Sequence, residues 1–352
     1  MKAKKRNTTV IFILLVIGII IVSLYILQKL VMPKYMLDIV EGAMIAEYYE
    51  EEKNHDVIFI GDCEVYDSFI PAILWENYGI CSYIRGSAQQ LIWQSYYILE
   101  ETLQYETPDV VVFNVLSLKY NVPQKESYNR MTLDGMKFSI AKLKAIKASM
   151  LEEEEFLDYV FPILRYHSRI TKLKKEDFVY LFQKNKVTHN GYYMRVDVTP
   201  ATYIPEGRPL GDYSFGENAL LYLNKMVQLC KEQDIPLILV KAPSLYPYWY
   251  EEWEVQVEQF AKAHKLSYIN FLELIEECGI DYTTDTYDAG LHLNLSGAEK
   301  VTNWFGKFLQ EQYGLISRKE EEKLTAIWNK KLESYYIDKE KKTNEWLNIL
   351  NE

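Results

Sequence analysis

Cys63 lies in a tetrapeptide whose residue types suggest chemistry. The apolar run 57–60 ends in the sequence GDCE, and folding alone does not require a buried strand to end in this way. A thiolate is a strong nucleophile, and a nearby imidazole, helix N-terminus or donor amide lowers the pKa of a thiol from about 8.5. Cys63 is therefore a candidate nucleophile that would form a thioester. The alternatives are a small buried residue in an inactive fold used for binding, and one half of a disulfide with Cys81.

His292 is the best candidate for a general base among five histidines. Asp288 precedes it by four residues and Gly290 lies between them, so a carboxylate can bind one ring nitrogen and orient the other toward a nucleophile. Asp285 is a second candidate for the orienting acid. The remaining histidines lie among charged or polar neighbours and are predicted to be on the surface: His55, His167, His189 and His264.

Alternating strand and helix patterns predict the elements that would position these residues. Short apolar runs predict five strands, at 57–60, 80–84, 110–113, 237–240 and 267–271. The segments 87–105 and 216–233 between them have apolar residues at helical spacing. This alternation predicts an α/β fold with a doubly wound parallel sheet. Ligands bind such a sheet outside the carboxyl ends of its strands.

Further candidate site residues follow the predicted strands at that edge. Gly86 follows the second strand, and Asn114 and Ser117 follow the third, so all three are supporting candidates beside Cys63. Asp62 is another, with the alternative role of a turn residue that caps the loop amides. Lys241 ends the fourth strand, where a buried position requires an acidic partner.

Glu64 is the charged residue next to the candidate nucleophile. It is expected either to pair with Arg85 across the site or to be solvated.

The first 33 residues predict a membrane anchor. No residue from 7 to 28 is charged, and this run is long enough to cross a bilayer. A cleaved signal peptide is the alternative, but the run is long for one and no small-residue cleavage site follows it. The basic residues at 2–6 predict a cytoplasmic N-terminus and a single-pass protein of the cell membrane, with its main domain outside.

The rest of the chain is expected to form one large domain with additions. Residues 34–54 are expected to form a helical stalk and residues 55–317 the α/β domain, with an insertion at about 120–214 that includes a helix at about 132–150. Residues 318–352 predict a charged helix with one apolar stripe formed by Leu324, Ile327, Trp328 and Leu332. This helix is expected to pack on the domain or be solvated, with a partner-binding helix as the alternative.

Charge and aromatic content narrow the classes of ligand. The chain has 39 basic and 50 acidic side chains, a net charge of −11, which argues against nucleic acid as a partner. It also has 29 tyrosines, with aromatic clusters at 191–196 and 244–253. Core packing explains most of them, but exposed rings would suit stacking on a sugar or polyol.

These motifs, taken in order, resemble the SGNH/GDSL hydrolase superfamily over about residues 56–314. The resemblance rests on a strand-exit G-D-nucleophile, a glycine after the second strand, a polar residue after the third, and a terminal Asp…His block. It implies Cys63 in place of the nucleophilic serine, with His292 as base and Asp288 as acid. The Cys63 amide, Gly86, and either Asn114 or Ser117 would form the oxyanion hole. The chain departs from the family in having G-D-C, D-x-x-x-H and no G-x-N-D block.

The branch that this chain resembles most is membrane-anchored and moves acyl groups on cell-surface polymers. It includes the D-alanyl transfer proteins of the teichoic acid pathway and the alginate O-acetylation proteins. The resemblance implies acyl transfer or ester hydrolysis on a cell-envelope polymer, without a metal or organic cofactor. A multispanning membrane acyltransferase is the expected donor partner. The alternative is a non-catalytic envelope protein that binds a polymer or acts as a scaffold.

Overall fold

The computed structural model describes residues 2–32, 42–182, 186–204 and 206–351. The chain divides into two compact units, one formed by the segment up to residue 41 together with residues 152–186, and the other by residues 42–151 and 187–352. The first unit contains the long helix α1 (Lys2–Val31), of which Thr9–Val31 is long and apolar enough to cross a membrane. Among the described residues no other helix has this length and composition.

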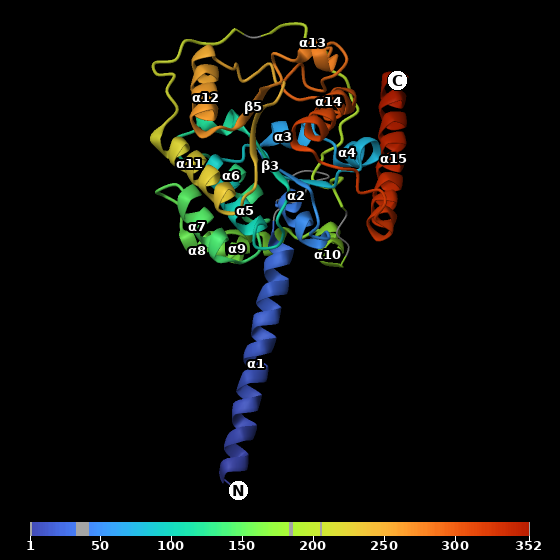
Figure 1. Ribbon diagram of the computed structural model, residues 1–352. Coiled ribbons are helices and arrows are strands. Elements are labelled where there is room, and N and C mark those ends of the chain that lie inside the picture. The colour runs from blue at the N-terminus through green and yellow to red at the C-terminus, as the bar shows by residue number, and fades with distance from the viewer. Residues whose placement is uncertain (1, 33–41, 183–185, 205, 352) are drawn as a thin grey trace. The chain divides into compact units, whose positions relative to one another are not determined.

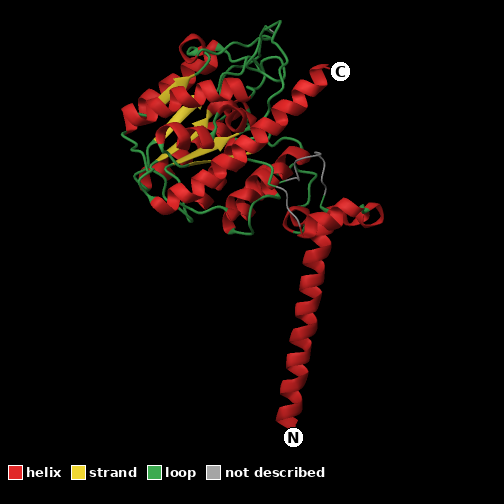
Figure 2. Ribbon diagram, turned by 90° about the vertical axis from the view of Figure 1, so that its right-hand side faces the viewer, coloured by secondary structure: helices red, strands yellow, loops and turns green. Residues whose placement is uncertain are grey.

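The second unit is built on a sheet of five parallel strands, which confirms the predicted α/β class. The strand order is β2-β1-β3-β4-β5. Each residue of the first four strands is buried, as expected for a sheet covered on both faces (Figure 2). The strands are β1 (Val57–Gly61), β2 (Ser82–Gly86), β3 (Val110–Asn114), β4 (Leu237–Lys241) and β5 (Ser267–Asn270).

This strand order places a topological switch point between β1 and β3. The chain leaves β1 toward β2 on one side, and β3 then pairs with the other side of β1. In open sheets of this order the crevice outside the carboxyl ends of these two strands is the usual ligand site. The carboxyl end of β1 leads directly into Asp62 and Cys63.

Two groups of helices pack on the sheet. Helix α14 contacts α3 and α4, whereas α5 contacts α7 and α11 (Figure 1). The bounds of these helices are α3 (Cys63–Ser68), α4 (Pro71–Tyr78), α5 (Ile92–Thr102), α7 (Ile140–Ser149), α11 (Glu217–Glu232) and α14 (Leu295–Tyr313). Other elements of this unit are α2 (Ala43–Ala46), η1 (Glu47–Glu50), η2 (Val115–Lys119), α6 (Glu126–Leu133), α12 (Glu251–His264) and α13 (Ile275–Cys278).

The charged C-terminal segment forms one helix, α15 (Glu322–Asn351), which packs along α4 (Figure 1). The Trp328 ring stacks on Trp75 with 5.5 Å between ring centroids, and Leu324 is buried beside them. Tyr335, two turns further on, is also fully buried. The predicted apolar stripe is therefore the face that packs on the domain.

Two segments differ from their predicted form. The expected stalk at 34–54 lies partly outside the described residues, at 34–41, and its remainder packs into the second unit as α2 and η1, where Ile45 and Tyr48 are fully buried. Within 120–214, the single helix expected at about 132–150 is replaced by α6 and α7, because the chain turns at Asp134 and Gly135. Residues 152–186 of the same segment belong to the first unit.

Candidate functional site

The candidate site begins at the turn between β1 and α3. Asp62 is the N-cap of α3, and its Oδ1 accepts a hydrogen bond of 3.2 Å from the Glu64 N–H. Asp62 therefore caps the helix, which is the alternative role that the sequence predicted for it. Cys63 is the first residue of α3 and is partly exposed at the carboxyl edge of the sheet.

Asp288 holds His292 at two points. Its Oδ2 accepts a 2.6 Å hydrogen bond from Nδ1 of the ring, and its Oδ1 accepts a 2.7 Å bond from the backbone N–H of His292. The loop that carries them turns at Gly290, which has φ +98° and packs against Leu245. Any other residue would be strained at this φ, so the loop requires a glycine at position 290. Asp288, rather than Asp285, therefore orients the ring.

The other ring nitrogen of His292 points toward α3. Nε2 has no hydrogen-bond partner among the described residues. It lies 4.0 Å from Oδ2 of Asp67, and the Cys63 thiol is close enough to affect the pKa of the ring. Cys63 and Asp67 are four residues apart in α3 and so share one face of that helix.

Asp67 and Tyr287 are site residues that sequence reasoning missed. Asp67 is 1% exposed, and its Oδ2 accepts a 3.1 Å hydrogen bond from the Tyr287 hydroxyl. The Tyr287 ring stacks on His292 with 5.6 Å between centroids, and its other neighbour is the Arg195 guanidinium at 4.2 Å. Oδ1 of Asp67 has no partner in the described part of the chain. The available signals were the position of Tyr287 next to Asp288 and the four-residue interval from Cys63 to Asp67.

The protonation of this cluster differs from the expected activated thiol. Burial and the Asp62 charge raise the pKa of Cys63, and His292 only partly opposes them. Burial would lower the pKa of His292, but the bond to Asp288, the contact with Cys63 and the charge of Asp67 raise it well above its ordinary value. Burial also raises the pKa of Asp67 to about 7, despite His292 and Tyr287. At neutral pH the site therefore holds a thiol and an imidazolium.

Behind the thiol lies a buried ion pair that spans the sheet. Nζ of Lys241 lies 3.0 Å from Oε1 of Glu64, and both side chains are almost fully buried. Asn114 donates its two amide hydrogens to Glu64 Oε2 and Asp62 Oδ1, at 2.9 and 3.1 Å, and accepts from the Ala242 N–H. The amide of Asn114 therefore has no hydrogen left for an oxyanion in this arrangement. Its role here is to join the exits of β1, β3 and β4.

Of the two remaining supporting candidates, Gly86 lies close to the turn that carries the thiol, whereas Ser117, in the described part of the chain, has no hydrogen bond to the site. Gly86 pairs with Gly61 across β2 and β1, and a Cβ there would lie 3.3 Å from the Asp62 carbonyl oxygen, so the backbone approaches the turn closely. Ser117 is buried three residues beyond Asn114, and its hydroxyl has no partner among the described residues. No hydrogen bond joins Ser117 to Cys63 or His292 there.

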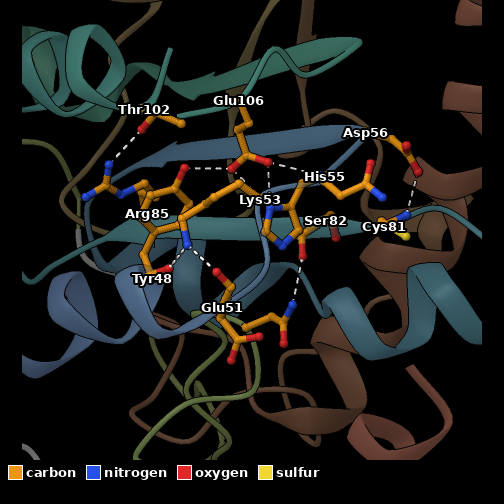
Figure 3. A network of polar contacts seen from close by, with 12 residues as sticks. Tyr48, Glu51, Lys53, His55, Asp56, Cys81, Ser82, Arg85, Thr102 and Glu106 are labelled. Carbon is orange, nitrogen blue, oxygen red and sulfur yellow. Dashed lines mark hydrogen bonds and ion pairs between the residues drawn. The ribbon is translucent and has the colours of Figure 1, made fainter. Parts of the chain in front are cut away.

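Arg85 does not pair with Glu64, which corrects one expectation. Arg85 is in β2 and fully buried, and its side chain points away from the turn into a network where it lies 4.0 Å from the centre of the Tyr48 ring and donates to Thr102 (Figure 3). Its ion-pair partner is Glu101 at 3.2 Å. Arg85 lies within β2, which extends through Gly86, so its side chain belongs to the strand and not to the exit loop.

Asp285 and two histidines also have structural roles. Asp285 is fully buried and binds Lys300 Nζ at 2.6 Å and the Asp281 N–H at 2.7 Å. His55, predicted at the surface, is instead buried and paired with Glu106 (Figure 3). His189, likewise predicted at the surface, is largely buried and lies 3.1 Å from Asp338 of α15.

A disulfide between Cys63 and Cys81 is absent, and the fold explains why. All four cysteines are free. Cys81 directly precedes β2, whereas Cys63 follows the carboxyl end of β1. Because β1 and β2 are parallel and paired residue for residue, the two cysteines lie at opposite edges of the sheet, separated by the length of β1, which is roughly 16 Å at about 3.3 Å per residue.

Both predicted aromatic segments reach the site. The N–H of Tyr193 donates to the Tyr66 carbonyl of α3 at 3.0 Å, and the Tyr246 hydroxyl donates to the Asp288 carbonyl. Most rings of 244–253 are packed together, as expected, and Trp249 and Trp253 are buried. Tyr248, at 43% exposed, remains available to a ligand.

Comparison with known proteins identifies no relative. No family model matches the chain, and no curated protein matches it significantly. The resemblance to the SGNH/GDSL superfamily therefore stays a prediction.

Proposed function

We propose that this protein is a thiol-dependent acyltransferase or esterase in which Cys63 is the nucleophile. The observation that carries the proposal is the arrangement of Asp288, His292 and Cys63. Asp288 fixes one nitrogen of the imidazole, the other nitrogen has no hydrogen-bond partner among the described residues, and the partly exposed Cys63 lies close enough to act on the ring. A carboxylate, an imidazole and a nucleophile in this order are the parts of acyl-transfer triads on several unrelated folds.

The reaction begins from the thiolate of Cys63, formed by loss of its proton to solvent. The sulfur bonds to the acyl carbon while the carbon–oxygen bond of the ester breaks, and the Nε2 proton of His292 passes to the departing alcohol. The imidazole, now neutral, takes a proton from an incoming alcohol or water whose oxygen displaces the sulfur. This returns a thiolate and an imidazolium. The raised pKa of His292 suits its first role as an acid, because the ring carries its proton before the ester binds.

Two groups are available to stabilise the negative oxygen of the intermediate. The backbone N–H of Cys63 belongs to the first turn of α3, where amides have no carbonyl within the helix to bind. The imidazolium of His292 supplies positive charge on the other side. Asn114 is not assigned to this role because its amide hydrogens are bonded to carboxylates.

The proposed substrate is an acylated polymer of the cell envelope, with the main domain outside the membrane. The apolar helix at Thr9–Val31 supports a membrane anchor, and the basic residues before it favour a cytoplasmic N-terminus. Tyr246 joins the aromatic segment after β4 to the Asp288 loop, so a sugar stacked on Tyr248 would lie on the segment that borders the site. A multispanning acyltransferase is the proposed source of the acyl group.

The second candidate is a non-catalytic protein that binds an envelope polymer with the same site. The observation in its favour is the raised pKa of the Cys63 thiol, which leaves little thiolate at neutral pH. The side-chain amide of Asn114 also favours this alternative, because its hydrogens are already bonded to carboxylates.

The test is acylation of the full-length protein in detergent by p-nitrophenyl acetate, with the adduct located by peptide mass spectrometry. We expect a hydroxylamine-sensitive thioester on Cys63 that forms faster as the pH rises, because the thiolate is the reactive form. Replacement His292→Ala should slow it by roughly 10²–10⁴-fold at constant pH.

The matched control is Cys278→Ala, which removes the other partly exposed cysteine and should leave the thioester unchanged. If Cys63 is acylated no faster than Cys278, or if His292→Ala has no effect, the site binds rather than reacts. Binding of neutral and acylated oligosaccharides by the unreactive protein would then favour the second candidate.

A further inference from the structure

The first unit contains a set of short helices around the end of α1. We call this set the collar; it consists of residues 156–182, with α8 (Phe156–Val160), α9 (Pro162–Tyr166), η3 (His167–Lys172) and α10 (Lys175–Phe182). Helices α9, η3 and α10 all contact α1 (Figure 1). The proposed acyl chemistry gives the collar no role.

Hydrogen bonds fix the collar at the last turn of the apolar helix. Nη1 of Arg169 donates to the carbonyl oxygens of Val31, at 2.8 Å, and of Met32. Nη2 of the same side chain lies 3.4 Å from Asp177, which ties η3 to α10. Val31 ends the apolar span and is fully covered. The collar is therefore held at the level where α1 would leave the hydrocarbon layer.

The collar exposes more apolar surface than a water-soluble face would carry. Its Phe182 side chain is 90% exposed, and six other large apolar residues are 44–55% exposed. These are Leu157, Phe161, Leu164, Ile170, Phe178 and Val179. Only a few of the collar side chains are buried, among them Tyr159 and Pro162. Exposure of this kind in short helices is typical of segments that lie in a membrane interface.

The charge of the collar complements an anionic surface. Residues 165–175 contain five basic side chains and no acidic one. Lys172, Lys174 and Lys175 among them are exposed. Basic residues beside a membrane span attract anionic headgroups. Long basic side chains can also place their stems along apolar surface and their charges in the headgroup layer.

We propose that the collar lies in the interface of the bilayer that α1 crosses, with its phenylalanines among the acyl chains and its lysines at anionic headgroups. The protein would then contact the membrane through two elements, the spanning helix and the collar. The continuity with α1 favours lipid over a second copy of the chain, because the end of an apolar span is itself at the lipid surface.

The test places a nitroxide at Phe178→Cys or Phe182→Cys in the full-length protein with Cys63→Ala and Cys278→Ala. The protein is reconstituted in nanodiscs, and the accessibility of the label to oxygen and to a water-soluble nickel chelate is measured. The control site is Leu221→Cys on α11, whose native side chain is 50% exposed. We expect an oxygen-to-nickel ratio at least several-fold higher at both collar sites than at the control.

The composition of the nanodisc tests the charge component. The ratio should rise with the fraction of phosphatidylglycerol, and Lys172→Gln, Lys174→Gln and Lys175→Gln together should remove that rise. Matched changes on α15, Lys323→Gln and Lys330→Gln, should not. Equal access of nickel to the collar and control labels would overturn the proposal. Spin–spin broadening between collar labels without oxygen access would overturn it in favour of a second copy.

Discussion

Oδ2 of Asp67 faces Nε2 of His292 at 4.0 Å, while Asp288 binds the opposite side of the same ring. The imidazole is thus placed between two carboxylates, one buried and one partly exposed. One carboxylate alone would orient the ring. The second carboxylate adds negative charge beside the imidazole and so keeps it protonated.

Asp67→Asn should lower the pKa of His292. The substitution keeps the shape of the side chain but removes one of the charges that raise the pKa of the ring. Titration of the histidine ring resonances by NMR measures the change. Asp197→Asn is the control, because Asp197 forms its ion pair with Arg195 instead. An unchanged His292 titration in Asp67→Asn would show that the two groups are not electrostatically coupled.

The buried Asp67 should also make stability depend on pH. Its pKa is raised to about 7, so its contribution to the free energy of unfolding is fully present below about pH 4 and is lost as the pH rises through about 7. Urea unfolding between pH 4 and pH 8 should therefore show stability falling with pH, and the slope should be smaller in Asp67→Asn. A slope that is identical in the two proteins would assign the dependence to other groups.

Replacing each of the two candidate acids should have a different effect. Asp288→Asn should slow acylation of Cys63 by roughly 10²–10⁴-fold, because the ring loses the group that orients it. Asp285→Asn should instead lower the free energy of unfolding by about 1–3 kcal/mol, since Asp285 is buried and bonded to Lys300. Acylation rate and urea unfolding measured on both variants test this. The reverse pattern would make Asp285 the orienting acid.

Breaking the ion pair behind the thiol should be costly. Lys241→Met leaves the Glu64 carboxylate buried without its cation and should lower the free energy of unfolding by roughly 3–5 kcal/mol. The double variant Glu64→Gln, Lys241→Met should recover a large part of this loss, because no charge then remains unpaired. Denaturant unfolding of the wild type, both single variants and the double variant gives the coupling energy. Strictly additive losses would mean that the pair does not interact.

The sequence was sufficient for features that depend on short intervals. The apolar runs predicted the strands, and the four-residue interval from Asp288 to His292 predicted their pairing, because both lie in one loop. The role of Asp67 required knowing that a helix begins at Cys63, since only then do positions four apart share a face. The pairing of Glu64 with Lys241 joins residues 177 positions apart and depends on the strand order. Arg85 was misplaced because β2 extends through Gly86, so its side chain belongs to the strand and not to the exit.

Helix α15 also fixes the order in which the site can be completed during synthesis. Residues 189–194, which run past α3, are bonded to this helix through His189 with Asp338 and through the Met194 carbonyl with Lys342. The second of these contacts joins positions of the chain that are 148 residues apart. The Cys63 turn therefore leaves the ribosome well before α15, and until then the segment 189–194 is held by its bonds to α3 and β2 without those to the helix. A protein truncated before Asp338 would retain Cys63 yet lose both helix contacts of the segment beside it.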